Sequence, residues 1–188
     1  LGRPQASLRL RCAMEGERPP RLREPLIVLA ALTLGLVWGV NAMTNRDPWW
    51  FWPWFHGRPV EIRITGSGQA RRFLPGSPEY ARLNDALNRS LSAFNIEGCE
   101  PAVGLSEATL SEYRQGSEAL ALWVHYDPPV QIHTTCFFPR ADTLLLPLRG
   151  PHATWRPVFG GLRGVLRLGA LRLRDRRDLE QAVQEVLR

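Results

Sequence analysis

The chain contains no lysine: all 24 of its basic residues are arginine, and with 18 acidic residues they give a formal net charge of +6. Two explanations stay open. A GC-rich genome would favour arginine codons over lysine codons, whereas selection for guanidinium groups would favour bidentate contacts to carboxylates or phosphates. Composition alone does not separate these two explanations.

Motifs for catalysis and metal binding are also missing. Neither HExxH nor CxxC occurs, so the sequence carries no strong metal signature. Residues 66–68 resemble the start of a dinucleotide-binding loop, but Arg71 replaces its third glycine and no helix follows. Residues 104–108 lack the last glycine of a nucleophile elbow, and Ser106 is better explained as a helix cap. The sequence therefore predicts no metal and no cofactor.

Histidines are few, and their positions do not form a recognisable ligand set. Two of the four, His125 and His133, lie on successive predicted strands, where a pair facing each other across a hairpin could hold zinc. A zinc site needs a third ligand, which the pattern does not supply. Ordinary polar surface is the favoured interpretation of this pair.

Charge is absent from residues 26–43, a run of 18 residues with charged neighbours on both sides. A helix of about 20 apolar residues crosses the roughly 30 Å hydrocarbon core of a bilayer. The run also lacks the polar stripe expected of a buried helix in a globular domain. We therefore predict a transmembrane anchor over residues 26–45, so that the lipid bilayer is one partner of the chain.

Aromatic residues follow the apolar run at once and include four of the seven tryptophans: Trp49, Trp50, Trp52 and Trp54. Indole rings favour the headgroup layer of a membrane, which predicts an interfacial position for this segment. The alternative is a hydrophobic strand of the following domain.

Arginine asymmetry predicts the orientation of the anchor. Five arginines closely precede the run and only three lie comparably near on the other side, which places the N-terminus in the cytoplasm. A signal peptide cleaved near residues 40–42 is the alternative, although the run exceeds a usual signal-peptide core. Both alternatives place the later residues outside the cytoplasm. The start itself stays open between Leu1 and Met14.

Four regions are therefore expected. They are a disordered cytoplasmic tail (1–25), the anchor (26–45), an aromatic juxtamembrane linker (46–58) and an extracytoplasmic domain (59–188). Within that domain, alternation predicts strands over 60–64, 69–74, 118–126, 130–138, 143–148 and 162–174, with a loop over 150–161. A turn at 66–68 joins the first two strands in a hairpin. Helices are predicted from Ser77 to near Asn95, over 107–115, and from Asp175 or Asp178 onward. The first of these helices has a core-facing apolar repeat: Tyr80, Leu83, Leu87, Leu91 and Phe94.

Successive strands joined by short turns must run antiparallel. The expected fold class is therefore α+β: one N-terminal transmembrane helix, followed by a domain with a mostly antiparallel sheet and about three helices.

Cysteine use is sparse. Cys99 and Cys136 both lie in the predicted outer domain, where an oxidising compartment would favour one disulfide between them. Two buried thiols that never meet are the alternative. Cys12 lies in the predicted cytoplasmic tail, or outside the protein if Met14 is its start.

Basic residues gather near the C-terminus. If a one-residue bulge at Gly169 corrected the phase of the predicted strand 162–174, one face would carry four arginines: Arg163, Arg167, Arg172 and Arg174. The stripe is interpreted either as a solvated strand face or as a binding site for an anionic surface or envelope protein. Nucleic acid is not expected as a partner outside the cytoplasm.

These patterns favour a membrane-anchored, extracytoplasmic binding or accessory domain that is not an enzyme. The alternative is a hydrolase-like envelope enzyme whose site is assembled from scattered residues: Ser106, His125, His133 and His152. Convergence of two of these histidines, or of one with a carboxylate, in a deep pocket would favour the enzyme.

Overall fold

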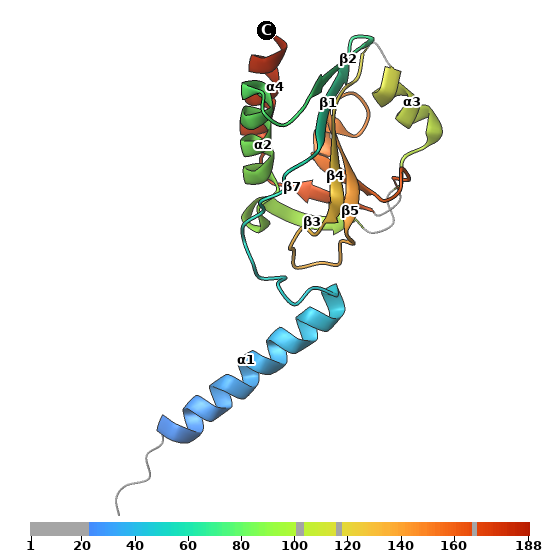
Figure 1. The fold of residues 1–188 in the computed structure, drawn as a ribbon. Helices are drawn as coiled ribbons and strands as arrows, with labels where there is room; N and C mark the ends of the chain where they lie inside the picture. Colours follow the sequence, from blue (N-terminus) through green and yellow to red (C-terminus); the bar gives the residue numbers. More distant parts are fainter. Residues whose placement is uncertain (1–22, 101–103, 116–117, 167–168) are drawn as a thin grey trace, which may run out of the picture. The chain divides into compact units, whose positions relative to one another are not determined.

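The computed structural model describes residues 23–100, 104–115, 118–166 and 169–188 (Figure 1). The chain divides into two compact units, Leu1–Val37 and Trp38–Arg188. The first unit contains the beginning of helix α1 (Arg23–Asn45), and the second contains the end of that helix and all other elements.

Helix α1 is long and apolar enough to cross a membrane, and none of the residues in its most apolar window is buried. Its 23 residues correspond to a length of about 35 Å at the usual helical rise. The predicted apolar helix is therefore confirmed as a candidate membrane span.

A seven-stranded antiparallel sheet organises the second unit, in the order β2-β1-β4-β5-β6-β7-β3. Its strands are β1 (Glu61–Gly66), β2 (Gln69–Phe73), β3 (Ile96–Glu100), β4 (Leu120–Val130), β5 (Ala141–Arg149), β6 (Pro157–Gly161) and β7 (Ala170–Leu173). With the helices below, the sheet confirms the α+β fold class.

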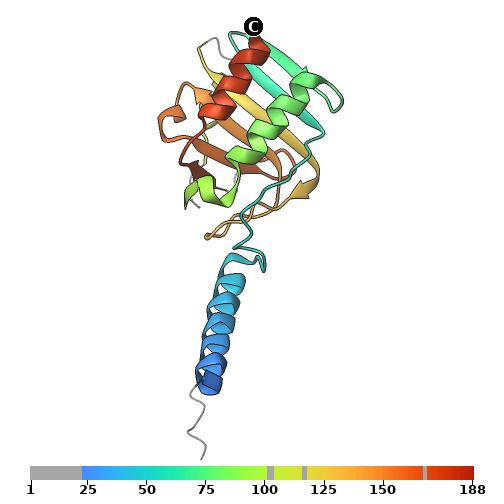
Figure 2. The same ribbon diagram turned by 90° about the vertical axis from the view of Figure 1, so that its left-hand side faces the viewer.

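Helices α2 (Pro78–Ser90) and α4 (Arg177–Leu187) lie side by side across one face of the sheet (Figure 2). The larger apolar core lies between these helices and inward-facing strand residues such as Ile62, Leu122 and Leu144. These positions alternate with outward-facing ones along each strand, because successive side chains of a strand point to opposite faces. We call this the closed face.

Helix α3 (Glu107–Gln115) packs over part of the opposite face, where a smaller apolar cluster includes Leu110, Tyr113, Leu145 and Phe159. We call this the open face. The bounds of α3 agree with the predicted helix, and the Ser106 hydroxyl caps it by accepting a hydrogen bond from the backbone N–H of Thr109.

Three predicted elements differ from the structure. Residues 131–140 form a loop and not a strand, and β6 occupies part of the predicted loop 150–161. Helix α2 ends at Ser90, five residues early, and a 3₁₀ turn, η1 (Ala93–Asn95), follows. As a result Phe94, predicted to face the core, is 71% exposed.

The predicted strand 162–174 is also wrong, because a tight hairpin turn interrupts it. Leu162 and Val165 exchange backbone hydrogen bonds of 3.1 and 3.2 Å, and the two residues between them, Arg163 and Gly164, have φ values of 54° and 78°. Two successive residues with positive φ are the mark of a type I′ turn. Residues 162–174 are therefore not one strand: a turn at Arg163 and Gly164 separates β6 from β7.

Candidate functional site

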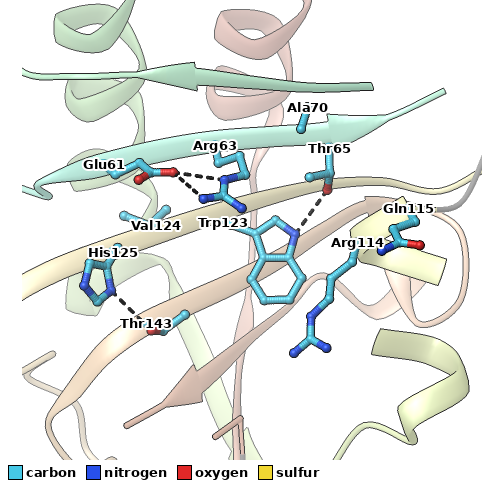
Figure 3. Close-up of a pocket in the computed structure, with 10 residues that line it drawn as sticks. All are labelled: Glu61, Arg63, Thr65, Ala70, Arg114, Gln115, Trp123, Val124, His125 and Thr143. Atoms are coloured by element: carbon cyan, nitrogen blue, oxygen red, sulfur yellow. Dashed lines mark hydrogen bonds and ion pairs between the residues drawn. The ribbon is translucent and has the colours of Figure 1, made fainter. Parts of the chain in front are cut away.

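A groove of about 460 Å³ lies on the open face, where α3 leaves the sheet uncovered (Figure 3). Strands β1, β4 and β5 supply its floor and α3 supplies one wall. Strand register places the floor residues side by side: Glu61 pairs with His125, Arg63 with Trp123, and His125 with Thr143. These residues occupy the positions that alternate with the core residues of the same strands.

Trp123 forms the centre of the groove, and hydrogen bonds hold its ring in place. Its indole Nε1 donates to Thr65 Oγ1 at 3.1 Å, and that hydroxyl donates to the backbone carbonyl of Tyr113 at 2.6 Å. Thr65 is buried, so this link ties the ring to both β1 and α3. The guanidinium carbon of Arg114 lies 5.8 Å from the ring centroid, within the range of a cation–π contact.

Glu61 lies towards one end of the groove and is bound by two arginines. Its carboxylate accepts hydrogen bonds from Arg63 at 2.8 and 2.9 Å and from Arg72 in a bidentate arrangement. The guanidinium of Arg72 lowers the pKa of Glu61 below its ordinary value of 4.5, with a smaller contribution from Arg63, although burial opposes both. The three side chains together carry one positive charge, and Arg114 adds a second.

His125 closes the same end of the groove and is exposed. Its Nδ1 lies 3.4 Å from Thr143 Oγ1, which itself donates to Asp142 at 2.8 Å. Asp142 also accepts a hydrogen bond from the backbone N–H of Arg163 at 2.6 Å. Of the four arginines in the predicted stripe, Arg163 is thus connected to the groove residue Thr143 by these two hydrogen bonds to Asp142.

The structure does not place the four arginines on one strand. Arg163 lies in the β6–β7 turn, Arg172 lies on β7 with its Nε 3.3 Å from Glu97, and Arg174 follows β7 and is exposed. Arg167 lies outside the described residues. The leucines of this segment also divide, because Leu166 belongs to the open-face cluster whereas Leu171 and Leu173 belong to the closed-face core.

Two of the other histidines, His133 and His152, have partners of their own away from His125. His133 Nδ1 lies 2.8 Å from a carboxylate oxygen of the buried Asp47. His152 makes edge-to-face contacts with Trp155 and Phe159. Ser106 caps α3. Across the described ranges, no group of three or more His, Cys, Asp or Glu residues is positioned to hold a metal ion.

Cys99 and Cys136 are joined in a disulfide with their Cα atoms 6.1 Å apart, inside the limit of about 7 Å for such a bond. The bond links edge strand β3 to the loop between β4 and β5. Of the predicted interfacial tryptophans, Trp49, Trp52 and Trp54 are exposed and Trp50 is half-buried.

The groove was not predicted from the sequence, although the alternation of the strands indicated which residues face it. The alternation over 60–64 and 118–126 assigned Glu61, Arg63, Trp123 and His125 to positions facing away from the core. That these positions are neighbours depends on the pairing of β1 with β4, which are separated by two helices in the sequence.

No protein-family model, no curated protein and no solved structure matches this chain. Its function therefore has to be inferred from the chemistry of its own residues.

Proposed function

We propose that this protein is a non-enzymatic binding domain held at a membrane by an uncleaved α1, with its N-terminus in the cytoplasm and the residues after about 45 outside. The length and apolar surface of α1 support the anchor. The excess of arginine before α1 supports the orientation. Protease added to spheroplasts should digest the domain and spare the N-terminal tail; a soluble form beginning near Met43 would instead establish a cleaved signal.

The groove on the open face is the proposed ligand site, and its ligand is an anion with a flat, apolar part. One observation carries this proposal: a fixed indole ring, Trp123, lies 5.8 Å from the guanidinium carbon of Arg114, and no described carboxylate pairs with that arginine. Arg63, which pairs with Trp123 in the sheet, is bound to Glu61 and adds positive charge nearby. The ring offers a stacking surface. Guanidinium groups offer paired donors to carboxylate, phosphate or sulfate.

Binding fits the groove better than general acid–base catalysis does. A general base needs a free carboxylate or imidazole with a pKa near the working pH. Glu61 is held by two guanidinium groups that lower its pKa, so it is a weak base. His125 shares the groove with Glu61, but that carboxylate is bound by Arg63 and Arg72, and the hydrogen-bond partner of His125 is Thr143. The other residues of the enzymatic alternative have separate partners.

The arginines near the C-terminus enter the proposal as a broader basic surface for the same kind of anionic partner. The backbone of Arg163 is linked through Asp142 to the groove residue Thr143, and Arg174 is exposed. Replacing Arg163, Arg167, Arg172 and Arg174 with glutamine should weaken binding to an anionic surface, and added salt should weaken binding by the unsubstituted chain.

The indole N–H signal of Trp123 gives a direct test in the full chain reconstituted in nanodiscs. Assigned with a Trp123→Phe variant, this NMR signal should shift on titration with phenyl phosphate and respond at least tenfold more weakly to inorganic phosphate, because only the former has a ring to stack. Arg114→Gln should weaken phenyl phosphate binding about tenfold through the loss of a charge-assisted contact.

Arg82→Gln is the matched control, because it removes one exposed arginine from α2 on the closed face. It should leave phenyl phosphate binding unchanged. Equal weakening by Arg82→Gln and Arg114→Gln, or equal affinities for the two phosphates, would contradict the proposal that the groove recognises this ligand class.

A further inference from the structure

Six exposed aromatic side chains gather in the second unit from three separate segments of the chain. Their exposed fractions run from 42% to 71%, and they are Trp49, Phe51, Trp52, Trp54, Phe94 and Phe137. We call this set the aromatic face. Each such side chain has roughly 150–250 Å² of surface, so the set exposes more apolar area than a soluble domain usually leaves in one place.

Contacts within the first segment make it one continuous surface. The rings of Trp49 and Trp52 lie 6.4 Å apart and those of Trp52 and Trp54 lie 5.2 Å apart, both nearly edge-to-face. Phe51 lies 6.1 Å from Trp49. These rings contact one another mainly edge to face and still leave about half of their surface exposed.

Phe94 joins the aromatic face because α2 ends early. The backbone N–H of Ala93 donates to the carbonyl of Pro53 at 2.9 Å, which fixes η1 against the tryptophan segment. Trp54 and Phe94 then line the same surface hollow. A continued helix would have pointed Phe94 towards the core, as its position in the α2 periodicity predicts.

Phe137 joins from the loop between β4 and β5. The guanidinium carbon of Arg46 lies 5.5 Å from its ring centroid, only three residues before Trp49. The preceding residue, Cys136, is held by the disulfide to Cys99. Asp47 ties the two segments further, since it accepts from the backbone N–H of Trp49 at 2.9 Å and lies 2.8 Å from His133 of the same loop.

We propose that the aromatic face lies in the headgroup layer of the bilayer, so that the folded domain itself docks on the membrane through Phe94 and Phe137 as well as through the tryptophans. This inference rests on the proposed anchor. A span that ends at Asn45 leaves only three residues before Trp49, so the Cα atoms of Asn45 and Trp49 lie at most about 14 Å apart. The bilayer is therefore the apolar phase within reach of this surface.

The chemistry of the face also fits lipid. Indole rings favour the interface, where their N–H groups stay hydrated. The two phenylalanines have no polar group and gain from deeper contact with acyl chains. Arg46, beside Phe137, adds a positive charge that suits anionic headgroups.

Photo-crosslinking of the full chain in vesicles of phosphatidylethanolamine and phosphatidylglycerol tests this placement. p-Benzoylphenylalanine is introduced in place of Phe94 or Phe137, with Trp54 as a third position if either variant unfolds more readily than the unsubstituted chain. Leu74 is the matched control, because it is 55% exposed and precedes the N-terminal end of α2, whereas Phe94 follows the C-terminal end. Leu34, in α1, reports on the anchor.

Lipid adducts at 94 and 137 should exceed those at 74 about tenfold, since a residue in the headgroup layer has lipid as its main neighbour. Adducts at 34 with only background at 94 and 137 would overturn the docking and leave the anchor intact. Background at all positions, 34 included, would overturn both. Crosslinked dimers at 94 or 137 in place of lipid adducts would assign the face to a second copy of the chain and overturn the docking.

Discussion

The two faces of the sheet are made by the same strands but differ in what covers them. On β4, Leu122 and Val124 are fully buried under α2 and α4, whereas Trp123 and His125, one residue along, line an open groove. On β1, Ile62 and Glu61 divide in the same way. Alternation along a strand therefore separates residues that stabilise the fold from residues that are free to bind a ligand.

The coverage of each face explains this division. Two amphipathic helices exclude water from the closed face, while α3 is only nine residues long and covers part of the open face. Side chains on the open face can thus be polar without the cost of burying an unpaired group. Substitutions on the two faces should have opposite consequences for stability and binding.

The largest expected difference comes from truncating one residue on each face of β4. Leu122→Ala should lower the free energy of unfolding by about 2 to 5 kcal/mol, because it removes a fully buried side chain and leaves a cavity. His125→Ala, three residues along and exposed, should change it by no more than about 0.5 kcal/mol. Denaturant unfolding of the full chain in nanodiscs measures both changes. Similar decreases in the free energy of unfolding would show that the two faces do not differ in their contribution to stability.

Thr65 is the exception that sharpens the comparison, because it faces the groove and is nevertheless buried. Thr65→Val keeps the shape but removes the acceptor for the Trp123 indole and the donor to the Tyr113 carbonyl. Stability should fall by about 1 to 3 kcal/mol. The Trp123 indole N–H signal should also broaden as the ring gains freedom; an unchanged signal would show that Thr65 does not hold the ring.

Tyr126 is the corresponding exception on the closed face. Its hydroxyl is buried and has no hydrogen-bond partner among the residues that the structure describes, and burial raises its pKa. Tyr126→Phe should therefore stabilise the protein by about 1 kcal/mol. The matched control is Tyr80→Phe, whose hydroxyl donates to the carbonyl of Pro59 at 2.5 Å, and which should destabilise by a similar amount. Thermal unfolding of both variants checks the opposite signs.

The smallest effect is expected from the pH dependence of the Glu61 cluster. The folded pKa of Glu61 is lowered mainly by Arg72, so its contribution to stability is present above the unfolded pKa near 4.5 and is lost as pH falls through the lower folded pKa. Unfolding midpoints of the unsubstituted chain and of Glu61→Gln should therefore converge over that window. When both chains also carry Arg72→Gln, the difference between their unfolding midpoints should be smaller at every pH. An unchanged difference would show that a group other than Arg72 lowers the pKa of Glu61.

Local patterns predicted much of this fold. The apolar run predicted α1, the Ser77 cap with its apolar repeat predicted α2, and alternation around a turn predicted the β1–β2 hairpin. The Ser67-Gly68 turn adopts positive φ at both residues, as the short loop between those strands requires. Each of these patterns depends on residues that are close in the sequence, so the geometry of a helix, strand or turn is enough to interpret it.

What the sequence determined by itself is therefore most of the local elements and, on β1 and β4, the inward or outward direction of the strand residues. Tertiary structure decided the rest: that Arg163 and Gly164 form a turn, that residues 131–140 stay a loop tied by a disulfide, and that α2 stops in time to expose Phe94. Only the pairing of β1 with β4 brings Glu61, Arg63 and Trp123 into one groove. Such pairings join residues about sixty positions apart, and their energy comes from contacts that no local pattern records.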